Sequence, residues 1–250
     1  DGMEFDKGYV SPYMVTDQEH REAVLEAPLV LMTDQSINST QELIPVLEYA
    51  MQQKRPLLIV AKDVEGQALA TLVINVASKV LKACVVKAPG FGDEQGEMLD
   101  DIAILTGGAV ITKDKGGDLQ AQGIASLGTA EKVIVTKNKT TLIGGGGDEA
   151  AVGERVELLR GRAKLATSKW DREKIEKRVG KLGSGVAVLK IGAATETEAK
   201  ETKARVDDAL NATRAAMAEG VVAGGGRALF RSAGVLDNLD LSGDEALGAS

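Results

Sequence analysis

Cysteine and histidine are almost missing from this chain, which limits the chemistry that it can perform. Cys84 is the only cysteine and His20 the only histidine among its 250 residues. One cysteine cannot form a disulfide within the chain, and one histidine leaves little material for a zinc site or a Ser-His-Asp triad. Cys84 lies in the apolar run of residues 83–86, so we expect a buried structural thiol and no metal site.

Long apolar runs and clusters of basic residues are also lacking. The apolar runs have the length of a strand, as at residues 57–61, whereas a helix needs about 20 apolar residues to cross a bilayer. The net charge is -7 with the two signs interspersed, while nucleic acids are bound by clustered basic faces. We therefore expect a globular protein that binds neither membrane nor nucleic acid. Because the chain begins at Asp1 without a signal-peptide pattern, we also expect a fragment of a longer protein.

Aromatic residues are scarce at 3%, so the core must be built from aliphatic side chains, while 29 glycines supply turns and helix ends. Two helices are predicted at residues 41–53 and 67–79, with Pro45 tolerated in the first turn of the former. Short β-rich runs alternate with these helical patterns, which predicts an α/β fold. The strands are predicted at residues 29–32, 57–61, 83–87, 109–112, 132–136, 141–143 and 186–191.

Charged helical patterns replace this alternation in the second half of the chain. Two stretches within residues 148–181 indicate an antiparallel helical pair, and Thr167 or Ser168 is a suitable N-cap for the second. A long helix is predicted over residues 195–218, with capping-box spacing at its start. The run of glycines at residues 144–147 indicates a loop.

The helices predicted at residues 41–53 and 67–79 are apolar on more faces than one core contact requires. A helix that is apolar around most of its circumference is normally buried, and the residues alone favour that interpretation. The alternative is a two-helix hydrophobic groove for non-native polypeptide, because flexible aliphatic and Met side chains adapt to different partners.

Two glycine-rich turns precede helical patterns and would let a backbone approach a phosphate. The first, at residues 90–92, has the spacing G-x-G-x-x-x-G and is followed by carboxylates that oppose a pyrophosphate, so a structural turn is favoured. The second, at residues 224–226, is favoured as a loop at the start of a helix. Asp207 and Asp208 point about 100° apart on the predicted long helix, where solvated charges are the default interpretation.

Taken together, several stretches in one order resemble the group I, GroEL-type chaperonins. They are Gly2 to Tyr9, Pro56 to Ile59, Asp63 to Gly66, Val86 to Asp93, Leu105 to Gly108, Asp171 to Lys174, Gly192 to Glu196, Lys203 to Val206 and Val221 to Gly226. The resemblance implies a layered apical-domain fold with an appended long helix. It divides the chain into an apical polypeptide-binding domain at residues 1–186, the C-terminal half of the intermediate domain at 187–218, and the start of a truncated equatorial domain at 219–250.

The resemblance implies a molecular chaperone that captures non-native polypeptides. In that family, client polypeptides and the mobile loop of the co-chaperonin compete for an apolar groove between two apical helices, which the preceding extended segment supports. Met14 stands where an aromatic residue is expected, which leaves the groove apolar but changes its shape. The positions carried over are Tyr9, Ser11, Tyr13, Met14, Ile44, Leu47, Leu69, Val73, Ile74 and Asn75.

ATP hydrolysis with Mg²⁺ is implied for the full-length subunit. Asp208 matches the aspartate that helps to position and activate the attacking water. Gly225 matches the glycine whose backbone approaches the nucleotide, with Gly224 and Gly226 beside it. The phosphate-binding loop and the metal-binding aspartate belong to equatorial sequence outside this chain, and phosphoryl transfer needs both. We therefore expect this chain alone to bind no cofactor and to hydrolyse no ATP.

The same resemblance implies the partners and the compartment. The full-length subunit would form a double ring of heptamers, receive a GroES-type co-chaperonin and act on unfolded or partly folded polypeptides. It would work in the bacterial cytoplasm, with an organelle matrix or stroma as the alternative.

Two other functions remain open from the residues. One is an α/β nucleotide- or sugar-phosphate-binding protein that uses the two glycine-rich turns. The other is an assembly module whose apolar helices are permanently buried in a subunit interface. The accessibility of Ile44, Leu47, Leu69 and Val73 separates these functions from a capture groove, since complete burial would exclude capture.

Overall fold

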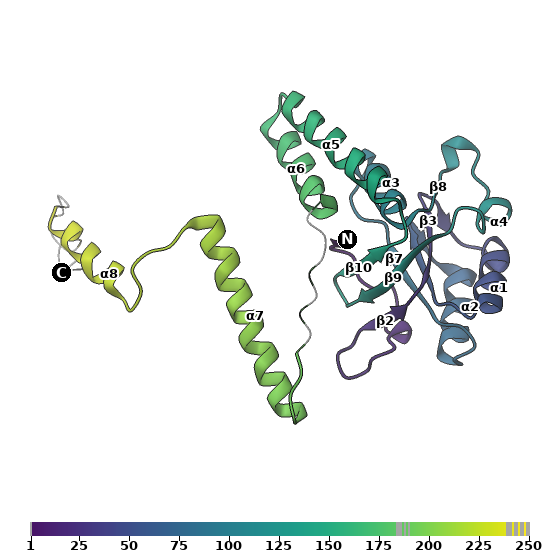
Figure 1. The fold of residues 1–250 in the computed structure, drawn as a ribbon, viewed down its shortest axis with the longest axis horizontal. Helices are drawn as coiled ribbons and strands as arrows, with labels where there is room; N and C mark the ends of the chain where they lie inside the picture. The colour runs from purple at the N-terminus through teal and green to yellow at the C-terminus, as the bar shows by residue number, and fades with distance from the viewer. Residues whose placement is uncertain are drawn as a thin grey trace. The chain divides into compact units, whose positions relative to one another are not determined.

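The computed structural model describes residues 2–183 and 191–238, together with positions 187, 189, 242, 245 and 248. The chain divides into two compact units, Asp1–Ala187 and Val188–Ser250 (Figure 1). The larger unit contains the β-sheet and most of the buried apolar residues.

An eight-stranded mixed sheet forms the centre of the larger unit. Its strands are β1 (Gly2–Phe5), β2 (Ala23–Glu26), β3 (Leu29–Thr33), β5 (Leu57–Ala61), β7 (Ala83–Lys87), β8 (Val110–Ile111), β9 (Gly128–Val135) and β10 (Thr140–Gly145). In the parallel part, Leu31 of β3 lies beside Ile59 of β5, which lies beside Val85 of β7. Every residue of β3 and β5 is buried, as is usual for parallel strands that are covered on both faces. The predicted α/β class is thus confirmed.

β8 pairs parallel with the end of β3. The other strands pair antiparallel, in the order β1, β10, β9, with β2 and β3 both pairing with β9. Two short strands, β4 (Ser36–Ile37) and β6 (Asp63–Val64), form a separate parallel pair. Six of the seven predicted strands are confirmed. Half of the seventh, at residues 186–191, falls outside the described residues, and the described positions 187, 189 and 191 are not in a strand.

The order of the parallel strands decides which face each helix covers. Helix α1 (Ile44–Gln53) joins β3 to β5, and α2 (Gly66–Ala77) joins β5 to β7, so both crossovers step in one direction. Helix α3 (Asp93–Thr106) returns from β7 to β8 on the far side of β3. Because such crossovers are right-handed, α1 and α2 share one face of the sheet and α3 covers the other. Figure 1 shows this arrangement.

The two apolar helices begin and end close to the predicted residues. A 3₁₀-helix, η2 (Thr40–Glu42), precedes α1 and is closed by a capping box between Ser39 and Glu42. Pro45 lies in the first turn of α1, as predicted. Lys54 ends that helix in the left-handed conformation at φ 52°, and its N–H is bonded to helix carbonyls.

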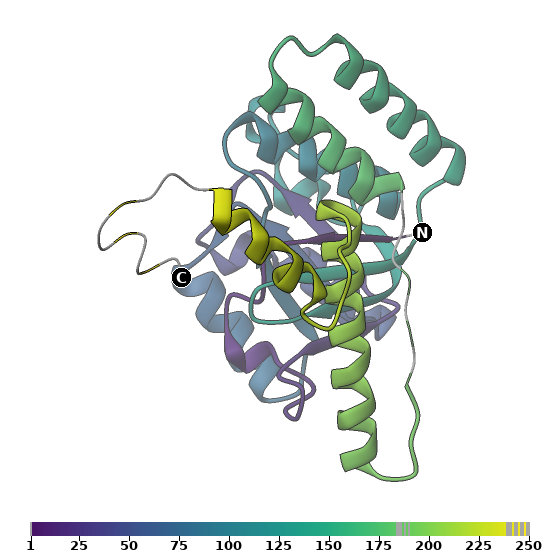
Figure 2. The same ribbon diagram turned by 90° about the vertical axis from the view of Figure 1, so that its left-hand side faces the viewer.

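The charged half of the larger unit forms the predicted helical hairpin. Helices α5 (Glu149–Leu165) and α6 (Lys169–Gly183) lie side by side in Figures 1 and 2. The backbone N–H of Asp171 donates to the hydroxyl of Ser168 at 3.4 Å, which identifies Ser168 as the cap. The hairpin packs on α3 through both of its helices.

The glycine run at residues 144–147 is explained by close packing against α3. The end of β10 passes over the last turn of that helix, where the N–H of Gly147 donates to the carbonyl of Leu105 at 2.9 Å. A Cβ atom on Gly145 would lie 2.0 Å from the same carbonyl oxygen. Only glycine fits this approach, so part of the predicted loop is the end of a strand.

The smaller unit contains helix α7 (Glu196–Glu219), helix α8 (Arg227–Ser232) and the 3₁₀-helix η4 (Ala233–Asn238). The predicted capping spacing is used at the start of α7. Thr195 accepts a hydrogen bond from the N–H of Glu198 at 3.3 Å, and Glu198 in turn accepts one from the N–H of Ala194. The long helix is therefore confirmed, with its first turn fixed by its own side chains.

Candidate functional site

Three segments meet on the face of the sheet that α1 and α2 cover. The 3₁₀-helix η1 (Pro12–Met14) contacts α2 on one side, and η2 contacts it on another. The hydroxyl of Thr40 in η2 donates to the hydroxyl of Thr71 in α2 at 3.0 Å. The sequence-predicted polypeptide-binding residues between positions 9 and 75 are thereby brought onto neighbouring elements.

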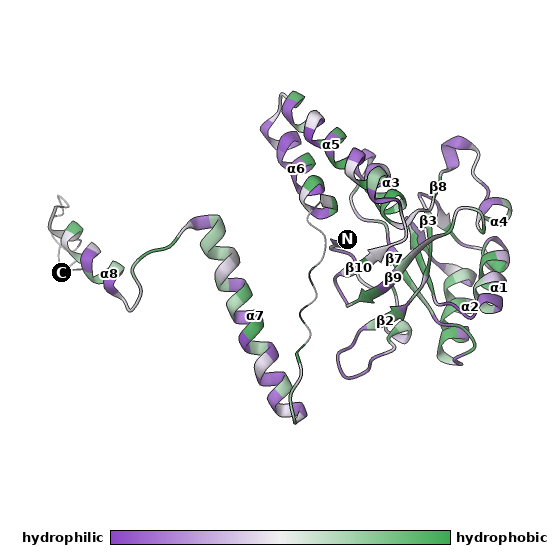
Figure 3. Ribbon diagram, viewed as in Figure 1, coloured by the Kyte–Doolittle hydropathy of each residue, from purple (hydrophilic) through white to green (hydrophobic). Residues whose placement is uncertain are grey.

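Helix α2 presents apolar side chains both to the core and to solvent. Ala68 and Leu72 face inward and are buried. Leu69 and Val73 are half-buried, and Ile74 is 65% exposed. Figure 3 shows hydrophobic residues along the length of the helix. Its apolar circumference therefore does not mean complete burial.

Helix α1 has a second stripe of the same kind. Val46 and Ala50 are buried against the core, whereas Ile44 is 41% and Met51 48% exposed, and Leu47 lies half-buried between them. The spacing of positions 44, 47 and 51 places these side chains on one face of the helix. We call Ile44, Leu47, Leu69, Val73 and Ile74 the α1–α2 face.

Asn75 forms a polar edge next to this face. It is half-buried, and its side-chain amide donates to the carbonyl of Thr71 at 2.8 Å. The bond lies within one turn of α2, so it fixes the side chain against its own helix. Within the described residues the amide has no other hydrogen-bond partner, so one N–H and the carbonyl oxygen of the side chain are unused.

The segment before the sheet contributes one strongly exposed aromatic residue. Tyr13 is 66% exposed, and its backbone N–H is capped by the hydroxyl of Ser11, which is itself nearly buried. Met14 is fully buried, and its sulfur accepts a hydrogen bond from the N–H of Val85 at 3.2 Å. Contrary to the expectation from sequence, the side chain of Met14 therefore lies in the core and does not line the surface. Tyr9 is half-buried and forms a β-bridge to the edge strand β7.

A cleft of about 900 Å³ lies between the η1 segment and the end of α2. Tyr13 and Val15 line one wall, and Val76, Ala77 and Leu81 line the other. The cleft begins one turn beyond Val73, so it continues the apolar surface of α2. The rest of the lining includes the polar residues Thr16 and Gln18 and the two lysines Lys79 and Lys82. A space of this size with a mixed lining is suited to a partner that presents both apolar and polar side chains.

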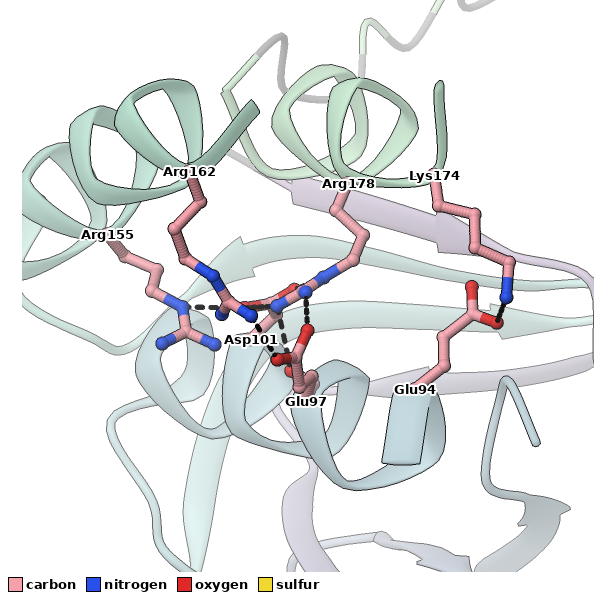
Figure 4. A network of polar contacts seen from close by, with 7 residues as sticks. All are labelled: Glu94, Glu97, Asp101, Arg155, Arg162, Lys174 and Arg178. Carbon is pink, nitrogen blue, oxygen red and sulfur yellow. Dashed lines mark hydrogen bonds and ion pairs between the residues drawn. The ribbon is translucent and has the colours of Figure 1, made fainter. Parts of the chain in front are cut away.

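A network of ion pairs fastens the helical hairpin to α3 (Figure 4). Asp101 is almost completely buried and accepts hydrogen bonds from Arg155 at 2.9 Å and from Arg178 at 2.8 Å. Glu97, one turn earlier, pairs with Arg162 at 2.7 Å and with Arg178. Lys174 completes the set through Glu94 at 3.1 Å.

Burial and neighbouring charges shift the pKa values of Glu97 and Arg178 in opposite directions. Partial burial favours the neutral form of Glu97, but hydrogen bonds from Arg162 and the positive charge of Arg178 outweigh it and lower the pKa of that carboxyl group. Burial likewise disfavours the charged form of Arg178, but its carboxylate partners Asp101 and Glu97 raise its pKa. All three α3 carboxylates in the network are paired, so the network is a structural clamp and leaves no free acid or base for catalysis.

The residues predicted to approach a nucleotide lie in the smaller unit. Asp208 is exposed on α7. The turn of Gly224, Gly225 and Gly226 precedes α8, with Gly225 at φ 66° and Gly226 at φ 74°, and no atom of the described structure lies within 4 Å of a Cβ placed on any of the three. The backbone of this turn is thus open to close approach.

The other glycine-rich turn is closed. The side-chain amide of Gln95 donates to the carbonyls of Ala88 at 3.3 Å and Gly90 at 3.5 Å, which fills the concave side of the turn. Asp93 and Glu94 stand in the first turn of α3 and repel an anion. These contacts support the structural interpretation of residues 90–92.

The sequence was compared with models of known protein families. The model of the TCP-1/cpn60 chaperonin family matches residues 1–250, the entire chain. The chain belongs to this family. A chaperonin acts as a molecular chaperone in protein folding, and members of the family are ATPases that assemble into oligomeric rings. The mixed α/β sheet of the larger unit is consistent with a chaperonin domain.

ATP and Mg²⁺ are used by the chaperonin family, and the described residues supply only part of such a site. No group of three or more His, Cys, Asp or Glu side chains within the described parts of the chain is arranged to hold a metal ion. Asp208 provides one exposed carboxylate and the turn at Gly225 an open backbone, but phosphate ligands are not among the residues beside them. These residues alone do not fit a magnesium–nucleotide complex.

Two further sequence expectations concern the cysteine and membrane-spanning helices. Cys84 is completely buried, and burial raises the pKa of its thiol to about 12, so a structural role is confirmed for this chaperonin. Among the helices that the structure describes, none is both long enough and apolar enough to cross a bilayer.

Proposed function

We propose that this chain is the polypeptide-capturing part of a group I chaperonin subunit. Residues 1–186 would form the apical domain, residues 187–218 the returning half of the intermediate domain, and residues 219–250 the start of the equatorial domain. The observation that carries the proposal is the outward apolar side of the α1–α2 face, where Ile74 is 65% and Ile44 41% exposed on helices that are otherwise packed on the core.

The energetics of this face favour capture of an unfolded chain. Exposed aliphatic surface gains about 25 cal/mol for each Å² that is removed from water, so an apolar segment laid across both helices is stabilised in proportion to the area it covers. Aliphatic side chains repack easily and offer few directional hydrogen bonds. Binding is therefore adaptable and not specific for one sequence, as a chaperone requires.

The half-buried positions would set the floor of the groove. Leu47, Leu69 and Val73 pack against the core on one side and keep the other side open to solvent. Tyr13 would extend this floor toward the cleft at the end of α2, while Asn75 would supply a polar contact for the backbone of the bound segment. Tyr9 and Ser11 would act by fixing the η1 segment, since both are mostly covered.

The partners and the ATP-driven cycle belong to the full-length subunit. The same face would receive the mobile loop of a GroES-type co-chaperonin, which would compete with client polypeptide. Asp208 and the turn of Gly224, Gly225 and Gly226 would join a nucleotide site completed by equatorial sequence. The whole subunit would form double heptameric rings in a bacterial cytoplasm or in an organelle matrix or stroma.

A comparison of exposed and buried positions on α1 and α2 tests the capture function. Ile74→Ser and Ile44→Ser remove apolar surface that only a client can cover, so affinity for a denatured protein should fall by about 1–2 kcal/mol per site with little change in melting temperature. Leu72→Ser is the matched control, because Leu72 is 1% exposed and should lower stability without a direct effect on the client. A large loss of stability in the first two variants, with unchanged client affinity per folded molecule, would refute the assignment.

A further inference from the structure

The two groove helices end at the same place, in a cleft with a strong excess of positive charge. Lys54 ends α1, Lys79 follows the end of α2, and both line a cleft of about 490 Å³ together with Arg55 and Lys82. We call this the cationic cleft. Glu26 is the one carboxylate among its lining residues, and Lys132 already pairs with it at 2.7 Å.

The backbones of the three lysines take part in hydrogen bonds of the fold, but their side chains form no ion pair within the described residues. Each is exposed, and within the part of the chain that the structure describes none has a carboxylate at ion-pair distance. The helix ends do not need them either, since backbone N–H groups already bond the last carbonyls: Arg55 to Ala50 at 3.0 Å and Val80 to Asn75 at 3.1 Å. Two helix C-termini contribute only about half a negative charge each, which leaves a positive excess in the cleft.

Arg55 has a different role from the lysines. Its guanidinium donates to the carbonyl of Ala27 at 2.8 Å and to that of Pro28 at 3.2 Å, so it holds the turn between β2 and β3. It adds charge to the cleft, but its side chain is fixed by these bonds.

The apolar stripe of α1 leads directly into this cleft through Met51, whereas the stripe of α2 leads into the neighbouring cleft beside η1, which shares Lys79 and Lys82 with the cationic cleft. On α1 the positions 44, 47 and 51 are followed one turn later by Lys54. On α2 the stripe of positions 69, 73 and 76 ends near the last turn of the helix, and Lys79 follows beyond the helix at φ 58° and lines both clefts. The apolar part of the lining consists of Val24, Ala50, Met51, Pro56, Val80 and Leu81, and no aromatic side chain is among the lining residues. A segment bound along the α1–α2 face would therefore pass from aliphatic side chains to lysines.

We propose that the cationic cleft binds acidic segments of client polypeptides that adjoin the apolar segment held by the α1–α2 face. This inference rests on the proposed function and narrows its substrates to apolar sequences flanked by carboxylates. Charge complementarity identifies the partner as acidic. The cationic cleft shares Lys79 and Lys82 with the neighbouring cleft, where Tyr13 is the one aromatic lining residue. A single aromatic side chain on a mainly aliphatic surface favours a polypeptide over a single-stranded nucleic acid, whose successive bases need successive stacking partners.

The test uses the 250-residue chain and two labelled peptides that share one unstructured Leu/Val core. One carries a tail of four Glu and the other a tail of four Gln. At low salt the Glu-tailed peptide should bind about three- to tenfold more tightly, as expected for a few exposed ion pairs. The difference should disappear at high salt, because exposed charges are then screened.

A pair of triple variants locates the effect. The cleft variant Lys54→Gln/Lys79→Gln/Lys82→Gln should bind both peptides equally well. The control variant Lys113→Gln/Lys115→Gln/Lys177→Gln makes the same change in net charge at exposed lysines outside the cleft, and it should keep the preference. The proposal would be overturned if the unmodified chain bound both peptides equally. It would also be overturned if the cleft variant and the control variant lost the preference for the Glu-tailed peptide to the same extent.

Two more measurements distinguish acidic-peptide binding in the cationic cleft from nucleic-acid binding there, and from apolar binding at the α1–α2 face on which the proposal rests. An oligonucleotide of equal charge that binds with the same lysine dependence would make the cleft a general polyanion site and overturn the assignment to polypeptide. The Gln-tailed peptide reports on the groove alone. If its affinity is unchanged by Ile74→Ser, the groove assignment fails, whereas the lysine dependence of the Glu-tailed peptide still decides the cationic cleft.

Discussion

Arg178 on α6 and Asp101 on α3 form an ion pair of 2.8 Å between side chains that are only 4% and 1% exposed. They lie 77 residues apart, and Arg155 of α5 reaches the same carboxylate. Two charges withdrawn from water are stable only because each is matched by partners of opposite sign. The position of the helical hairpin on α3 is thus set by paired charges as well as by the apolar contacts of Leu159 and Leu182.

Removal of Asp101 should therefore destabilise the larger unit strongly. Asp101→Ala leaves Arg155 and Arg178 without their shared partner inside the protein, which we expect to cost about 3–5 kcal/mol of unfolding free energy. Lys174→Ala breaks the more exposed pair with Glu94 and should cost about 0–1 kcal/mol. Urea denaturation of both variants measures the difference. Equal, small effects would mean that the apolar contacts of the hairpin suffice to hold it.

The clamp should also respond to acid through Glu97. The pKa of this carboxyl is below its ordinary value of 4.5, chiefly because Arg162 and Arg178 outweigh partial burial. A group whose pKa is lower in the folded state contributes stability above the unfolded pKa, and that contribution is lost as the pH falls through the folded pKa. The stability difference between the protein and Glu97→Gln should hence be constant above about pH 5 and shrink at lower pH. A pH-independent difference would contradict the role of the charge.

Local patterns were sufficient to predict the longer helices and the parallel strands of the main sheet, but not the short helix α4 (Leu119–Gln122) or the two-residue strands β4 and β6. The apolar runs at β3, β5 and β7 are bounded by turns, and the helices between them carry caps and a first-turn proline that act within a few residues. β1 and β2 were missed because each has only four residues and the alternation of buried and exposed side chains is too short to be distinctive.

Contacts between distant segments could not be predicted in the same way. Glu94, Glu97 and Asp101 follow each other at helical spacing on α3, which was a usable signal for one charged face, but their partners lie on α5 and α6. The burial of Met14 next to the exposed Tyr13 depends on the strand that passes beneath η1. Likewise, the lysines at the ends of α1 and α2 are far apart in sequence and meet only because both helices end at one cleft.

Two glycines in different settings should respond in opposite ways to the same substitution. Gly145→Ala places a methyl group 2.0 Å from the carbonyl oxygen of Leu105, a backbone atom that cannot move aside, and should destabilise the protein by about 1–3 kcal/mol. Gly153→Ala lies within α5, where no described atom apart from the neighbouring backbone of the helix lies within 4 Å of the new Cβ, and should stabilise the protein by about 0.5–1 kcal/mol. Thermal unfolding of both variants checks the two signs. Tolerance of Gly145→Ala would show that β10 can shift away from α3.

The neighbours Tyr13 and Met14 offer the sharpest separation of client binding from stability. Tyr13 is 66% exposed and borders the cleft at the end of α2, whereas Met14 is fully buried and accepts a hydrogen bond from Val85. Tyr13→Ser should lower affinity for a denatured client by about 1–2 kcal/mol, because the aromatic surface is covered only in the complex, and should barely change the melting temperature. Met14→Ser should instead cost about 2–5 kcal/mol of folding stability, since it opens a cavity and buries a hydroxyl.

Client affinity per folded molecule decides the outcome for this pair. This affinity is measured by titration of a denatured protein at a temperature where both variants are folded. It should fall for Tyr13→Ser and stay near the original value for Met14→Ser. The reverse pattern would mean that the η1 segment rearranges on binding and exposes Met14, so that the client contacts the sulfur side chain directly. Unchanged affinity in both variants would confine client binding to α1 and α2.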